Sequence, residues 1–163
     1  MKGSENMGKI ELGFRRVHSQ SLYEAAEREK GKEWVKALKE RESKYCDCTF
    51  ELEVPDITGK SEKQIQYAER LRFNELNKRV EMFFKRIDGK IDVLKENDPF
   101  AAKIDECLEH YCLTRVSDMA KAVVLEEGAT LLKMTDAAKI IDYCTDYGGI
   151  CMEIIENRSK KEN

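Results

Sequence analysis

The stretch VPDITGKSEKQIQYAERLR, residues 54–72, decides most of the fold prediction. Pro55 ends an extended segment, and residues 58–60 have the composition of a turn. Ser61 followed three residues later by Gln64 forms a capping box, in which the two side chains satisfy exposed N–H groups at the start of a helix. The stretch therefore predicts a strand, a turn and a capped helix.

Apolar residues at helical spacing extend this helix from Glu62 to about Ile87, with a possible break after it at Asp88-Gly89. The predicted apolar face consists of Ile65, Phe73, Leu76, Val80, Phe83, Phe84 and Ile87. Basic residues recur off this face every seven or eight positions, and we expect them to be exposed and able to contact phosphates or an acidic protein surface. Because acidic residues interrupt the rows, a solvated face with ion pairs at helical spacing is the alternative interpretation. The basic residues are Lys63, Arg70, Arg72, Lys78, Arg79, Lys85 and Arg86.

Two alternating segments precede the helix and predict paired strands. Residues 46–54 place Cys46, Cys48 and the apolar residues on one face and polar side chains on the other. A shorter alternation beginning at Ile10 predicts a first strand that ends near residue 17. Between them, Ser19 or Ser21 is expected to cap a helix that runs to about residue 44 and is weakened in its middle by Gly31.

Three further helices are predicted downstream. Asp98-Pro99 supplies an N-cap followed by proline at the first helical position. The next two helices are expected to begin at residues 117–118 and at Thr135 or Asp136, and to end at Gly128 and at residues 148–149. Residues 150–156 fit a last helical turn or a short strand. The expected buried positions of the first and last of these helices are Phe100, Ile104, Cys107, Leu108, Tyr111, Ala138, Ile141 and Tyr143.

Composition and length predict a single charge-coated domain. The chain has 163 residues, of which 37% are charged, against a usual value of about 25%. No apolar run approaches the roughly 18 residues of a membrane span, and no signal peptide is visible, which favours the cytoplasm. We predict a flexible N-terminus over residues 1–8, one domain over 9–156 and a polar tail over 157–163. Its fold class is α+β, with a small antiparallel β element packed on a bundle of about four to five helices.

Charge is unevenly distributed along the chain. The formal net charge is −3, with +3 over residues 1–95 and −6 over residues 96–163. A dedicated nucleic-acid-binding domain usually has a strong basic excess, so nucleic acid binding is predicted only through a local patch. The acidic C-terminal part instead offers a candidate partner-binding surface. It consists of Asp105, Glu106, Glu109, Asp118, Glu126, Glu127, Asp136, Asp142 and Asp146.

Six cysteines and two histidines limit the possible chemistry. We interpret the cysteines as reduced thiols that serve packing. Cys46 and Cys48 could supply half of a tetrahedral zinc site, completed by Cys107 with His110, or by Cys144 with Cys151. The spacing lacks the paired C-x₂-C pattern of a typical zinc site, so metal is the less favoured interpretation and no other cofactor is expected. No nucleotide-binding loop and no complete catalytic set is present, so no catalytic residue is assigned and an enzyme is not expected.

Residues 54–72 resemble a motif of an uncharacterised family of small proteins from bacteriophages and other mobile genetic elements. That motif reads Leu-Pro-x-Leu-x-Gly-Ser-Glu-Lys-Gln-Ile-x-Trp-Ala-x-x-Ile-Arg, and this chain differs from it in the inserted Lys60, in Tyr67 and in Leu71. The C-x-C at Cys46 and residues 135–142 are similar to further elements of the family. About a quarter of the chain is covered. The resemblance implies a phage or mobile-element origin and carries no catalytic role.

These observations predict a non-enzymatic accessory protein that binds a host protein or ribonucleoprotein. The most specific version of this prediction is an inhibitor of a defence nuclease, of the anti-CRISPR type. In it, the acidic surface occupies a basic nucleic-acid channel of the nuclease. The alternatives are a nucleic-acid-binding protein that uses the basic helix face and a zinc-dependent regulatory module.

Overall fold

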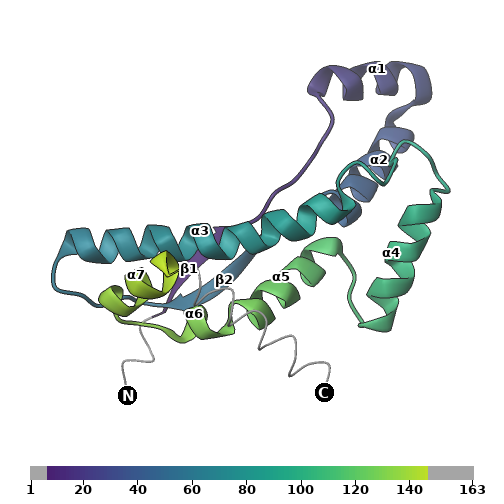
Figure 1. The fold of residues 1–163 in the computed structure, drawn as a ribbon. Helices are drawn as coiled ribbons and strands as arrows, with labels where there is room; N and C mark the ends of the chain where they lie inside the picture. Colours follow the sequence, from purple (N-terminus) through teal and green to yellow (C-terminus); the bar gives the residue numbers. More distant parts are fainter. Residues whose placement is uncertain (1–6, 147–163) are drawn as a thin grey trace. The chain divides into compact units, whose positions relative to one another are not determined.

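The computed structural model describes residues 7–146, which form seven helices and a two-stranded antiparallel sheet (Figure 1). This arrangement confirms the predicted α+β class with a small β element on helices. The elements are β1 (Met7–Leu12), α1 (Gln20–Lys30), α2 (Lys32–Tyr45), β2 (Phe50–Pro55), α3 (Glu62–Ile87), α4 (Pro99–His110), α5 (Val116–Glu127), α6 (Ala129–Lys133) and α7 (Ala137–Thr145).

The described residues form two compact units, each assembled from separate parts of the chain. Unit 1 contains residues 7–12, Glu51–Val80 and 122–146, and unit 2 contains Gly13–Phe50 and Glu81–Lys121. That residues 9–156 form one domain stays a prediction.

Unit 1 is built on the turn that the sequence predicts after β2. The Thr58 N–H donates to the Thr135 carbonyl, and the Ala137 N–H donates to the Thr58 carbonyl, both at 2.8 Å. These bonds hold the turn against the start of α7, which lies beside the N-terminal half of α3 (Figure 1). The core of the unit is apolar: Leu12, Leu52, Val54, Ile57, Ala68, Leu76, Val80, Val124, Leu131, Ala137 and Ile140 are buried.

Unit 2 is centred on α2, whose inner face carries four buried residues. Val35, Leu38, Glu42 and Tyr45 follow one another at spacings of three and four, so they lie on one side of the helix. The Tyr45 hydroxyl donates to Asp105 of α4 at 2.6 Å. The remaining core of the unit consists of Cys48, Ile87, Val93, Leu108, Val116 and Ala120.

Local signals placed several elements correctly. Helix α3 has the predicted bounds, and its Gln64 N–H donates to the Ser61 hydroxyl at 3.1 Å. The return contact differs from a standard capping box, because the Gln64 side-chain oxygen Oε1 accepts from the Lys60 N–H at 2.8 Å and not from the N–H of Ser61. Asp98 caps α4, as predicted, and Asp136, one of the two predicted candidates, caps α7.

Two predicted element extents in the N-terminal half were wrong. The segment predicted as one helix up to residue 44 is divided at Gly31, whose φ of 96° interrupts helical geometry. The strand predicted over 46–54 begins only at Phe50, although the Cys48 N–H still donates to the Phe14 carbonyl at 2.8 Å. Gly13, with φ 134°, ends β1 before this irregular pairing begins.

Smaller corrections concern burial and the C-terminal part. Tyr111 and Phe73, both expected inside, are 63% and 38% exposed, and α7 buries Ala137 in place of Ala138. Helix α6 was not predicted, because it has five residues and no side-chain cap. The predictions for residues 1–6, for the glycines at 148–149 and for residues 150–163 lie outside the described residues.

Candidate functional site

A row of basic, amide and aromatic side chains lies on α3 within unit 1. We define this outer face of α3 as six exposed residues that share about one third of the helix circumference. The Arg70 guanidinium lies 5.3 Å from the centre of the Tyr67 ring. No acidic residue is among the six: Lys63, Gln66, Tyr67, Arg70, Phe73 and Asn74.

The other basic residues predicted on this helix serve different roles. Arg72 was expected to be exposed, but it is 4% exposed and donates through Nη1 to the Pro55 carbonyl at 2.8 Å. Burial lowers the pKa of this guanidinium. Lys78 and Arg79 lie 3.7 and 3.9 Å from Glu75. The remaining two basic residues are in unit 2, where Lys85 pairs with Glu81 at 3.2 Å and Arg86 is exposed.

The nine acidic residues of the predicted partner surface are divided between the two units. Asp105, Glu106, Glu109 and Asp118 belong to unit 2, and the other five belong to unit 1. Asp105, Asp118 and Asp136 have contacts that stabilise the fold. Burial tends to raise the pKa of Asp105, but hydrogen bonds from Tyr45 and Lys44 lower it below its ordinary value. Asp118 accepts from the N–H groups of Thr114 and Arg115, and Asp136 caps α7.

Four of the possible zinc ligands belong to unit 2: Cys46, Cys48, Cys107 and His110. The described residues contain no group of three or more side chains that could hold a metal ion. Burial raises the pKa of Cys46 to about 11 and that of Cys48 to about 12. Both are therefore thiols near neutral pH. The second proposed pair falls partly outside the described residues, since Cys151 is not among them; its partner Cys144 has a pKa raised to about 11 by burial.

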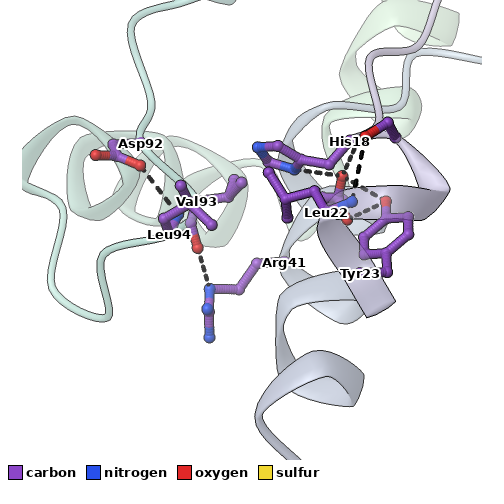
Figure 2. A network of polar contacts seen from close by, with 9 residues as sticks. His18, Leu22, Tyr23, Arg41, Asp92, Val93 and Leu94 are labelled. Carbon is purple, nitrogen blue, oxygen red and sulfur yellow. Dashed lines mark hydrogen bonds and ion pairs between the residues drawn. The ribbon is translucent and has the colours of Figure 1, made fainter. Parts of the chain in front are cut away.

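The structure also shows a polar network that the sequence did not predict. Glu42 of α2 is 3% exposed and accepts hydrogen bonds from the His18 N–H at 2.9 Å and from the Tyr23 hydroxyl at 2.6 and 2.9 Å. His18 Nδ1 lies 3.1 Å from the same carboxylate. Figure 2 shows the side chains of His18 and Tyr23 converging on this point. Burial and the Glu42 carboxylate raise the pKa of Tyr23 to about 12.

This network borders a cavity of about 360 Å³ that lies within unit 2. His18, Glu42, Tyr45 and Phe84 are among its lining residues. A neighbouring cavity of about 230 Å³ is lined by Arg41, which donates through Nε to the Val93 carbonyl at 2.7 Å (Figure 2). Its buried Nη2 atom has no hydrogen-bond partner among the described residues.

A signal for the two buried charges was present in the sequence. Glu42 interrupts the apolar series of Val35, Leu38 and Tyr45, and Arg72 lies between Ala68 and Leu76 at helical spacing. A charged residue inside an apolar stripe is buried with a partner or marks a site. The partners could not be identified from the sequence, because His18 and Glu42 are separated by 24 residues.

Comparison with known proteins gives no match: no family model, no curated protein and no solved structure is similar to this chain. Among residues 7–146, no helix combines the length and apolar character required to cross a membrane.

Proposed function

We propose that the chain is a non-enzymatic accessory protein that acts in the cytoplasm by binding a host nucleoprotein, with the outer face of α3 in contact with single-stranded nucleic acid. The observation that carries the proposal is the composition of that face. Lys63 and Arg70 offer cations, Gln66 and Asn74 offer amides, and Tyr67 and Phe73 are 39% and 38% exposed.

This combination fits single-stranded nucleic acid better than a protein surface. Phosphates attract the cations, and an exposed aromatic ring stacks with a base of any sequence. Stacking on one ring contributes about 1–3 kcal/mol per base. A protein interface would more often place aromatic residues at a centre depleted of lysine. The motif resemblance supports a phage or mobile-element origin, because Lys63 matches the motif and Tyr67 stands at the position of its tryptophan.

Binding of a fluorescent oligouridylate, followed by anisotropy at increasing salt, tests the proposal. We expect Lys63→Ala with Arg70→Ala to weaken binding about tenfold or more and to reduce the salt slope by about 1.4, since each single-strand phosphate contact contributes about 0.7. Tyr67→Ala should weaken binding with little change in slope, because stacking is not electrostatic.

The matched control is Lys133→Ala with Lys139→Ala. These two lysines are exposed on α6 and α7 of the same unit, so the control removes the same charge elsewhere. We expect it to retain most of the affinity. Absence of oligouridylate binding by the parent protein at low salt, or equal losses in the two double variants, would contradict the proposal.

A second candidate function is inhibition of a host defence nuclease by charge mimicry. It is supported by the exposed carboxylates of Glu126, Asp142 and Asp146, which belong to unit 1. Acidic side chains of an inhibitor can occupy a basic nucleic-acid channel and speed the encounter. This candidate requires no contribution from the outer face of α3. Substitutions on that face and substitutions of the three carboxylates therefore distinguish the two candidate functions.

A further inference from the structure

The cavity beside Glu42 has the size and lining of a small-molecule site. Its volume of about 360 Å³ lies at the lower end of the range of about 300–1,000 Å³ typical of ligand pockets. All of its lining residues belong to unit 2. Six of the thirteen lining residues are apolar or aromatic: Val17, Tyr45, Phe84, Ile87, Ile91 and Val93.

The polar part of the lining is dominated by carboxylates. Glu42, Asp88 and Asp92 line the cavity together with a single guanidinium, that of Arg16. Arg16 is paired with Asp88 through two contacts of 2.8 Å, so its charge is already compensated. Two carboxylates therefore remain to set the charge of the cavity, and an anionic ligand would be repelled.

Glu42 retains capacity to accept another hydrogen bond. Its Oε2 atom accepts from the His18 N–H and the Tyr23 hydroxyl and lies 3.1 Å from His18 Nδ1. Its Oε1 atom has one contact in the network, from the Tyr23 hydroxyl at 2.6 Å. A carboxylate oxygen has two lone pairs, so Oε1 can accept from a further donor. Figure 2 shows His18 facing the segment of Asp92 and Val93, which line the same cavity.

We propose that this cavity binds a small organic amine as its cation. The ammonium group donates to Glu42, and the apolar body packs against Phe84 and Ile91. An ammonium group also interacts favourably with aromatic rings, and Phe84 and Tyr45 both line the cavity. The same attraction is visible at Tyr45, where the Lys44 ammonium lies 5.2 Å from the ring centre. This proposal is independent of the α3 outer face, which belongs to unit 1.

Isothermal titration with three probes of similar shape tests the charge requirement. The probes are phenethylamine, the neutral phenethyl alcohol and the anionic phenylacetate, measured at about pH 8, where an aliphatic amine is a cation. We expect saturable binding of phenethylamine, at least about tenfold weaker binding of the alcohol and no binding of phenylacetate. No saturable binding of phenethylamine, or equal binding of the amine and the alcohol, would overturn the proposal.

Two variants locate the binding. Glu42→Gln should weaken phenethylamine binding about tenfold or more, whereas Glu40→Gln, on the exposed side of the same helix, should leave it unchanged. Ile91→Trp fills the cavity, keeps the Glu42 network and should abolish binding even if Glu42→Gln fails to fold. Thermal unfolding and the amide NMR spectrum confirm that each variant is folded. Unchanged phenethylamine binding by folded Ile91→Trp would show that the amine binds elsewhere, and it would refute the site.

Discussion

Two buried charged residues, Glu42 and Arg72, determine how parts of each unit are held together. Glu42 is 3% exposed and Arg72 is 4% exposed. Burial of a charge is unfavourable unless hydrogen bonds replace its hydration. Glu42 accepts hydrogen bonds from the His18 N–H and the Tyr23 hydroxyl, and Arg72 donates one to the Pro55 carbonyl. Each residue thus attaches a loop or helix to a distant part of the same unit. Removal of a hydrogen-bond partner would leave the buried charge without compensation and would destabilise the fold.

The Tyr23 contact predicts a loss of stability in alkali. The folded protein raises the pKa of Tyr23 to about 12 from its ordinary 10.0. The unfolded state therefore releases this proton at lower pH, and the associated stability is present below about pH 10 and is lost as the pH rises towards 12. Tyr23→Phe should remove this part of the pH dependence. At neutral pH it should cost about 1.5–3 kcal/mol, because the lost hydrogen bond has a charged acceptor.

Urea unfolding of the parent and of Tyr23→Phe between pH 7 and 12 measures this effect. The pKa values of Cys46 and Cys48 are also raised in the folded protein, so these thiols too reduce stability as the pH rises. Both the parent and Tyr23→Phe should therefore lose stability in alkali. The difference between the two curves isolates Tyr23, and we expect it to shrink above about pH 10. A difference that stays constant up to pH 12 would refute the role assigned to the Tyr23–Glu42 hydrogen bond.

At the scale of elements, Gly31 decides that α1 and α2 are separate helices. Its φ of 96° and ψ of 166° lie in a region that only glycine adopts without strain. Helix α1 contributes no fully buried residue. It is therefore held by its Ser19 cap and by the Tyr23 contact with α2 rather than by a core of its own.

Gly31→Ala is expected to destabilise the protein by about 1–3 kcal/mol, because alanine cannot adopt this backbone conformation without strain. Urea unfolding followed by circular dichroism gives the change. Gly8→Ala is the matched control: an added Cβ would lie 3.6 Å from the Asp56 side chain, an ordinary contact. If the two substitutions have equal effects, or if Gly31→Ala stabilises the protein by joining the helices, the assigned backbone strain is wrong.

At the scale of the whole molecule, the charge asymmetry of the sequence does not carry over to the folded units. The described part of unit 1 has 9 Lys and Arg and 12 Asp and Glu, whereas unit 2 has 16 of each. Each unit draws residues from both halves of the chain, so the basic and acidic halves are mixed. Function must then depend on local patches, such as the outer face of α3 or the carboxylates of unit 1.

Affinity capture from host lysate, with and without nuclease treatment, distinguishes these patches. We expect the parent to recover a nucleoprotein whose capture is lost after nuclease treatment and in Lys63→Ala with Arg70→Ala, since its contact is with nucleic acid. The triple variant Glu126→Lys, Asp142→Lys and Asp146→Lys should retain it.

The control reverses three exposed carboxylates of α1, Glu24, Glu27 and Glu29, and should also retain capture. Nuclease-resistant recovery of one protein, lost only in the unit 1 triple variant, would favour inhibition of a defence protein over nucleic acid contact.

The sequence by itself determined the features that depend on neighbouring residues. The bounds of α3 and the caps of α4 and α7 follow from residues at most four positions apart, because hydrogen bonds at helix ends are local. The helical spacing of α3 likewise predicted which of its basic residues lie off the apolar face. It was wrong about Arg72, which is buried.

Only the tertiary structure decided which charges are buried and where a cavity forms. His18 meets Glu42 across 24 residues and Arg16 meets Asp88 across 72, and the cavity wall combines these segments. Such pairs are selected by packing of the whole unit, which no local pattern specifies. The physical reason is that helical period and capping act over one or two turns, whereas burial depends on every segment that covers a residue.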